Sequence, residues 1–79
     1  MSELKPHRSL NVRGLYCPEP VFRTKIEVQS MKVGEILEVL ADDPVAEIDI
    51  KNWVERTGQE LLEFTKKEKE LRFLIRKVK

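Results

Sequence analysis

This chain of 79 residues has very few of the residues that cross-link small proteins. It contains one cysteine and one histidine, so it can form no internal disulfide and offers no Cys/His set for a structural metal. A chain of this size buries only about 60% of its unfolded surface, which leaves a modest core. We therefore expect a single domain over residues 1–79 that is stabilised by its core alone, with neither a metal nor another cofactor.

The chain also lacks an excess of one charge and a long apolar run. Its 15 basic residues nearly balance 14 acidic ones, which gives no general signal for nucleic acid or an anionic membrane. No segment has the length of a membrane span, and the start lacks the apolar run of a signal peptide. We expect a cytoplasmic protein with no membrane partner and no direct binding of nucleic acid, since reducing surroundings suit a free thiol.

The informative part of the chain begins with a short strand and a turn. Leu10 and Val12 alternate with polar neighbours, which indicates a half-buried strand over residues 8–13. Gly14 follows, at a position where a turn often needs a backbone angle that only glycine adopts without strain. We therefore predict a strand that ends in a tight turn.

A helix start follows this turn. Pro18 and Pro20 fit the first helical turn, where the missing N–H has no partner anyway, and Glu19 adds a negative charge that the helix dipole favours. The single cysteine, Cys17, is thus predicted at or just before a helix N-terminus. Exposed N–H groups at such a position stabilise an anion and lower a thiol pKa.

Charged neighbours can change this effect on the thiol. The carboxylate of Glu19 opposes it if that side chain points at the sulfur, whereas Arg13 and Arg23 can offset the carboxylate. The sequence does not say where these side chains point.

The rest of the chain alternates helices and strands. The signals predict a helix over residues 18–31, a strand over 35–41, a helix over 44–57, and a hairpin of strands over 60–66 and 70–78. With the first strand, the order is βαβαββ. This order predicts an α/β (α+β) two-layer sandwich, in which a mixed four-stranded sheet carries both helices on one face.

Apolar stripes on both helices are interpreted as core. In the first helix the stripe is Phe22 and Ile26, continued by Val21, Val28 and Met31. In the second helix it is Ala46, Ile50, Trp53 and Val54. A tryptophan can line a binding site, but on an apolar helical face it is more often part of the core.

Several polar residues have both a chemical and a structural interpretation. Asp42 and Asp43 suggest a metal or acid/base pair, but an aspartate before Pro44 is favoured as a helix cap. His7 can act as a base or ligand, but it has no partner at ligand spacing. We interpret it as a solvated residue of a frayed start, residues 1–7.

The charged end of the chain has two open interpretations. The run over residues 66–70 mixes both signs, which is typical of a solvated turn. Arg76, Lys77 and Lys79 either attract RNA or an acidic partner, or keep a sheet edge soluble.

The segment around Cys17 resembles the TusA/SirA-like sulfur-carrier family. The family signature, Arg-Gly-Leu-x-Cys-Pro-x-Pro, stands complete here as Arg13, Gly14, Leu15, Tyr16, Cys17, Pro18, Glu19 and Pro20. The likeness continues through Lys32-Val33-Gly34-Glu35, Asp42-Asp43-Pro44, Asp49-Ile50 and Gly58, and it covers nearly the whole chain from Leu10 onward. The family has the same βαβαββ sandwich that the periodicity predicts.

The resemblance implies a sulfur carrier, a sulfurtransferase-like relay protein. In the family, the motif cysteine accepts sulfane sulfur as a persulfide from a cysteine desulfurase or rhodanese-type protein, and passes it to an acceptor protein. Routes served include tRNA thiolation, molybdenum cofactor assembly and sulfur oxidation. Carried over, Cys17 bears the sulfur, Pro18 and Pro20 shape its turn, and Arg13 and Gly14 belong to the signature.

The sequence departs from the family pattern at Asn11, where aspartate is frequent, and at Lys51, where proline is frequent. We expect specificity to come from contacts around the cysteine, with Arg13, Arg23 and Lys25 steering partners. Two alternatives stay open. One is a non-catalytic regulatory or redox-sensing module, and the other is an RNA-binding module that uses the basic last strand and the open sheet face.

Overall fold

The computed structural model describes residues 5–79. Its elements follow the order βαβαββ: β1 (Arg8–Asn11), α1 (Glu19–Gln29), β2 (Ile36–Ala41), α2 (Pro44–Thr57), β3 (Glu60–Lys67) and β4 (Glu70–Arg76). The predicted order and fold class are confirmed. The second helix has the predicted bounds, whereas the first strand, the first helix and the last strand are each shorter than predicted.

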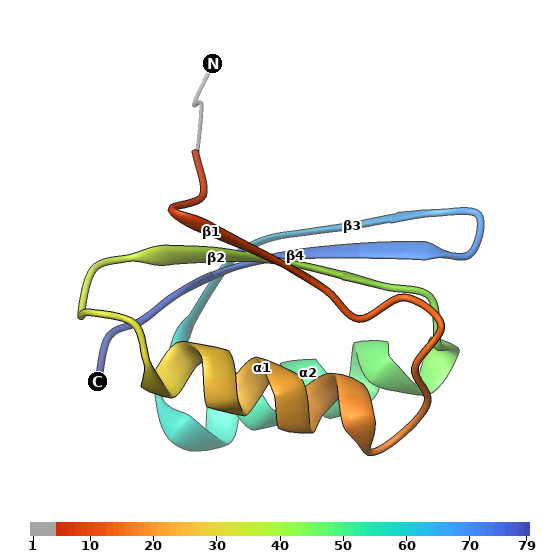
Figure 1. Cartoon of the computed structure of the whole chain (residues 1–79), viewed down its shortest axis with the longest axis horizontal. Coiled ribbons are helices and arrows are strands. Elements are labelled where there is room, and N and C mark those ends of the chain that lie inside the picture. The colour runs from red at the N-terminus through yellow and green to blue at the C-terminus, as the bar shows by residue number, and fades with distance from the viewer. Residues whose placement is uncertain (1–4) are drawn as a thin grey trace.

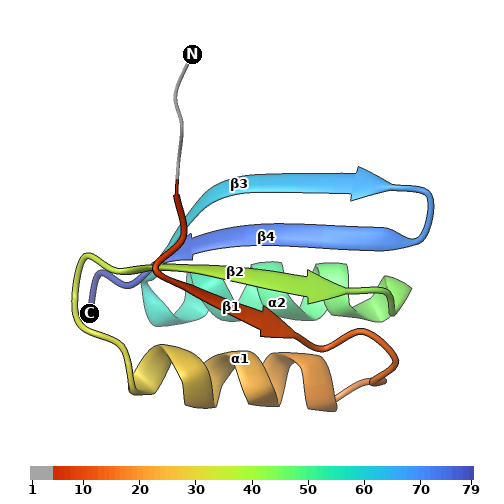
Figure 2. The ribbon, with the colours of Figure 1, turned by 45° about the horizontal axis from the view of Figure 1, so that its top comes forward.

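One mixed sheet carries both helices on the same face. The strand order is β1-β2-β4-β3, with β1 and β2 parallel and the other neighbours antiparallel. Figure 1 shows both helices beneath the sheet, with α1 in front of α2, and Figure 2 shows the strand order, with α2 behind the strands and α1 below β1. Because β1 and β2 are parallel, the loops that lead from them into α1 and α2 lie at the same end of the sheet.

The core fills the space between the sheet and the helices. On β2 the inward side chains are completely buried and alternate with partly exposed ones, as expected for a strand covered on one face. On β4 the inward side chains are also completely buried, and so is Leu74 on the outer face. The buried inward residues are Leu37, Val39, Ala41, Leu71, Phe73 and Ile75, against Ala46, Ile50, Trp53 and Val54 of α2. The predicted inner face of the second helix is therefore confirmed.

The predicted inner face of the first helix is partly wrong. Phe22 and Ile26 are 53% and 49% exposed, so they are not core residues. The buried face runs through Pro20, Thr24 and Val28 instead. Successive helical residues are about 100° apart, so these buried side chains point to a different side of α1 from Phe22 and Ile26. The threonine can be buried because its hydroxyl donates to the carbonyl of Pro20 at 2.8 Å.

The other predicted core residues of this helix lie near the sheet. Val28 and Met31 are buried, and Val21 is partly buried against the core. Apolar residues therefore occur on both the buried and the exposed sides of α1. Apolar spacing alone cannot identify the buried side of α1, because a threonine interrupts the apolar residues on that side.

Both ends of α2 carry the predicted signals. Asp43 is the N-cap, and its carboxylate accepts from the Val45 N–H at 3.1 Å. Gly58 ends the helix at a φ of 79°, in the left-handed region. The cap interpretation of the aspartate pair is therefore confirmed for its second member.

His7 is exposed, as expected, but it is not part of a frayed start. Its backbone N–H donates to the Ile36 carbonyl at 2.8 Å, and its Nδ1 accepts from the Ile36 N–H at 3.0 Å. The pairing of β1 with β2 thus extends back to this residue. Residues 1–4 of the expected frayed start lie outside the described part.

The basic residues at the end of the chain are engaged within the fold. The Lys77 ammonium donates to the carbonyls of Met31 and Gln29 at the end of α1, at 2.7 and 3.4 Å. Arg76 pairs with Glu60 of the neighbouring strand. These contacts favour a structural role for the basic end over an RNA-binding one.

Candidate functional site

Cys17 lies in the loop between β1 and α1, two residues before the helix begins, and its side chain is exposed. Pro18 occupies the N-cap position, so α1 begins one residue later than predicted and Pro20 stands in its first turn. The N–H of Glu19 donates back to the Tyr16 carbonyl at 2.9 Å, which closes a tight turn around the cysteine. The predicted position of Cys17 agrees with the structure.

A buried carboxylate links this loop to the start of α2. One oxygen of Asp43 accepts from the Cys17 N–H at 2.9 Å, and the other accepts from the Val45 N–H. The side chain of Asp43 is 6% exposed, which makes its hydrogen bonds stronger than surface ones. One residue therefore caps the second helix and fixes the backbone of the cysteine.

The remaining signature residues shape the loop. Gly14 has a φ of 83°, where a side chain would strain the backbone, and its N–H donates to Asp42 at 2.9 Å. Arg13 donates from Nε to Asn11 at 3.0 Å and pairs with Glu70 at 3.2 Å. The loop is thus tied both to α2 and to the hairpin of β3 and β4.

The Cys17 thiol donates a hydrogen bond to the carboxylate of Asp49, with 3.0 Å between Sγ and Oδ2. This bond raises the pKa of Cys17 above its usual value, with smaller contributions from desolvation and from the negative charges of Asp49 and Asp43. The sequence predicts the opposite direction, a thiol pKa lowered by the helix start. The prediction was wrong because it left out the carboxylates of Asp49 and Asp43, which act on the thiol.

The sequence left open where the side chains of Glu19 and Arg23 point. In the structure they pair with each other rather than with the Cys17 thiol. Glu19 pairs with Arg23 at 3.2 Å, one helical turn further on. Lys25 is exposed on the same helix. Arg23 is therefore engaged by Glu19, and it does not offset the carboxylates at the thiol.

Sequence reasoning missed the roles of Asp43 and Asp49 at the cysteine. They lie 26 and 32 residues beyond it, so no local motif joins them to the thiol. The topology carried the signal, because two helices that follow neighbouring parallel strands begin at the same sheet end. A polar residue in the first turns of α2 is then expected near Cys17.

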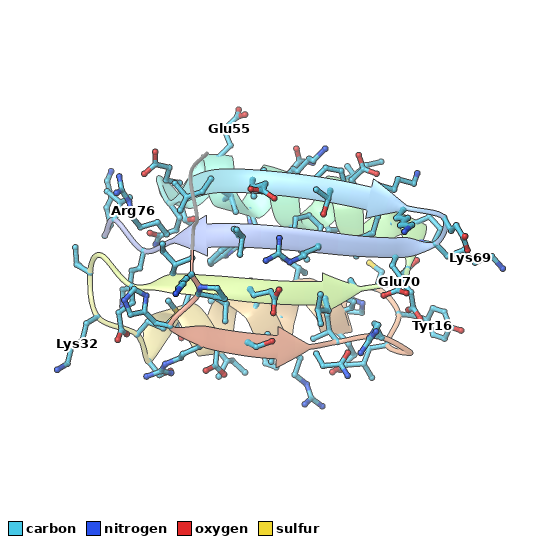
Figure 3. The ribbon with its side chains drawn as sticks, turned by 90° about the horizontal axis from the view of Figure 1, so that it is seen from above. Tyr16, Lys32, Glu55, Lys69, Glu70 and Arg76 are labelled. Carbon is cyan, nitrogen blue, oxygen red and sulfur yellow. The ribbon has the colours of Figure 1, made fainter. Side chains whose placement is uncertain are left out.

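A concave surface lies beside Tyr16, the residue before the cysteine, and both charged and apolar residues line it. Tyr16 is 72% exposed and Ile48 of α2 is 63% exposed. A depression of about 440 Å³ lies between the loop and the turn of the hairpin. Figure 3 shows Tyr16 at the same end of the molecule as Lys69 and Glu70 of the hairpin. The lining residues are Tyr16, Asp42, Pro44, Lys66, Glu68, Lys69 and Leu71.

Neither a metal-ligand cluster nor a membrane-spanning helix occurs in residues 5–79. No three His, Cys, Asp or Glu side chains of this range converge as a metal ion would require. Within the same range, no helix combines the length and apolar character needed to cross a membrane.

Comparison with known proteins places these features in a family. The family model described as "Sulfurtransferase TusA" matches residues 8–77. A protein of Archaeoglobus fulgidus named "Putative sulfur carrier protein" is 57% identical over 67 residues, which is 84% of this chain and 87% of that protein. "Putative sulfur carrier protein YrkI" of Bacillus subtilis is 39% identical over 94% of this chain and 99% of its own length.

A solved structure gives the same fold. The crystal structure of a SirA-like protein from Desulfitobacterium hafniense superposes with a TM-score of 0.77, over 91% of this chain and 99% of that one, at 22% identity. The complete signature at Cys17, the sandwich fold and the extent of the match agree, and the chain belongs to the TusA family of sulfur carriers.

Proposed function

We propose that this protein accepts sulfane sulfur as a persulfide on Cys17 and relays it to an acceptor protein. The observation that carries the proposal is the exposed thiol of Cys17 in a tight loop just before α1. Another protein's cysteine can approach such a sulfur directly. The signature residues that the family uses surround it, and their contacts hold the loop in place.

The partners follow from this chemistry. A cysteine desulfurase or rhodanese-type protein supplies the sulfur, and tRNA thiolation, molybdenum cofactor assembly or another branch of sulfur metabolism consumes it. Partner contact falls on the surface around the loop, where Tyr16 and Ile48 are exposed. Arg23 and Lys25 of α1 steer acidic partners toward this surface. A free thiol is best preserved in the reducing cytoplasm, where we place the protein.

The test is sulfur loading followed by intact mass. The protein is incubated with a cysteine desulfurase and cysteine that carries labelled sulfur, and one labelled sulfur atom is expected on the wild type. Cys17→Ser is the matched control and should remain unlabelled. An unlabelled wild type, or equal labelling of the two proteins, contradicts the proposal.

One observation favours a second candidate function, a non-catalytic binding module. The raised pKa of Cys17 makes the resting thiol a poorer nucleophile at neutral pH than the helix start alone predicts. The module needs no sulfur on Cys17 and should bind its partner equally well as Cys17→Ser. Loading and partner binding measured on the same variant therefore separate the two candidates.

A further inference from the structure

The carboxylate of Asp49 is the acceptor of the Cys17 thiol proton, and the sulfur transfer described above requires that proton to move. A thiol attacks as its thiolate, so the proton must leave Sγ before or during the attack. The Oδ2 atom lies 3.0 Å from Sγ, within reach for direct proton transfer. Asp49 is partly buried and comes from α2, a well-packed helix.

We propose that Asp49 is the proton acceptor for Cys17 during sulfur loading, and this inference rests on the proposed function. As the Sγ electron pair forms a bond to the outer sulfur of the donor persulfide, the thiol proton moves to Oδ2. The S–S bond of the donor breaks, and its electron pair stays on the donor's cysteine sulfur. The proton then passes from Asp49 to that thiolate, so the step needs no oxidant or reductant.

The other charged groups around the thiol do not fit this role. Asp43 also acts on the thiol through its charge, but its two oxygens already accept backbone N–H groups. From α1, Glu19 is paired with Arg23, and from the hairpin Glu70 is paired with Arg13. Asp49 is thus the carboxylate that contacts Sγ in the described residues.

The arrangement also explains how an exposed thiol with a raised pKa can react. In the resting state the carboxylate keeps Cys17 protonated, which protects it from oxidation and alkylation in solution. When a donor persulfide arrives, the same carboxylate removes the proton at the point of attack. Low reactivity toward small reagents and competence in sulfur transfer are then compatible.

The experiment measures loading of Asp49→Asn from a small persulfide, glutathione persulfide, across pH. Its rate is divided by the wild-type rate at each pH, which cancels the ionisation of the donor. General-base catalysis contributes about 10²–10⁴-fold, so we expect the variant to load at least about tenfold more slowly near pH 6. The difference should shrink as the pH rises, because a growing fraction of the variant's thiol ionises without help.

A second readout separates proton transfer from a purely electrostatic or structural role. Thiolate absorbance followed against pH should show a lower pKa of Cys17 in Asp49→Asn, because the group that accepts its hydrogen bond loses its negative charge. A lower thiol pKa together with slower loading near pH 6 is expected only if Asp49 takes the proton. Asp49→Glu restores a carboxylate and should recover part of the rate.

Glu47→Gln is the matched control, because it removes one negative charge from the same helix at a residue that pairs with Lys51. It should leave the pH profile unchanged. If Asp49→Asn loads faster than the wild type near pH 6, in step with its larger thiolate fraction, the inference is overturned while sulfur carrying stands. If the wild type itself takes up no sulfur, the proposed function fails and the inference fails with it.

Discussion

The two helices begin side by side, and their starts are built differently. Each has a proline in its first turn, but α2 is capped by the side chain of Asp43, whereas the start of α1 has no side-chain cap. The uncapped start is the one that follows Cys17. The positive end of the α1 dipole is thereby left without a side-chain cap near the sulfur, where the proposed anionic persulfide can use it.

Residues at the start of α2 therefore hold the loop that precedes α1 in place. Asp43 and Asp49 both belong to the start of α2, and they contact the backbone and the thiol of Cys17 respectively. The second helix therefore supplies the polar contacts, and the first supplies an open helix end.

The largest expected effect concerns the two sides of α1. Val28 is 2% exposed, so Val28→Ala should lower the free energy of unfolding by about 1–3 kcal/mol through lost burial and a cavity. Phe22 is 53% exposed, and Phe22→Ala should change it by no more than about 0.5 kcal/mol. Urea denaturation measures both. Equal losses would show that α1 packs through Phe22 as well as through Val28.

The next effect concerns the shared cap. Asp43→Ala removes the N-cap of α2 and the acceptor of the Cys17 N–H, and should cost about 1–2 kcal/mol in urea denaturation. Asp42→Ala is the control, since its carboxylate accepts only the exposed Gly14 N–H in the contacts described. A variant of Asp43 as stable as that control would argue against the shared cap.

The smallest effect is the pH dependence of Glu47 on α2. Lys51 donates to this carboxylate and lowers its pKa below the ordinary value of about 4.3. Because the folded-state pKa is lowered, the stabilisation is present above the unfolded-state pKa and is lost as pH falls through the folded-state pKa.

Titration of the Glu47 side-chain carbon by NMR measures this pKa directly. In Lys51→Gln we expect the midpoint to rise toward the ordinary value, and the stability of the variant to depend less on pH in acid. An unchanged midpoint would mean that the pair is not formed in solution.

The sequence predicted the fold well because its signals are local. The bounds of α2 follow from an aspartate-proline start and from Gly58 at the end, and each signal acts on its own neighbours. The inner side of α1 was predicted less well, because the buried Thr24 looks polar until its hydroxyl is seen bonded to Pro20. Side-chain burial depends on such partners as well as on hydrophobicity.

The candidate site was predicted only in part, for a related reason. The position of Cys17 before a helix depends on neighbouring prolines and could be predicted. The direction of its pKa shift depends on Asp49, which is distant in the chain, and the prediction was wrong. Electrostatics at the thiol depends on which residues the tertiary fold brings within a few ångströms.

The contacts from Asp43 and Asp49 have a practical consequence for work with fragments. A peptide copied from the signature would carry the cysteine and its prolines, but neither of the carboxylates that lie 26 and 32 residues further along. Its thiol would titrate and react as an ordinary one. Chemistry measured on such a fragment would therefore describe free cysteine rather than the folded carrier.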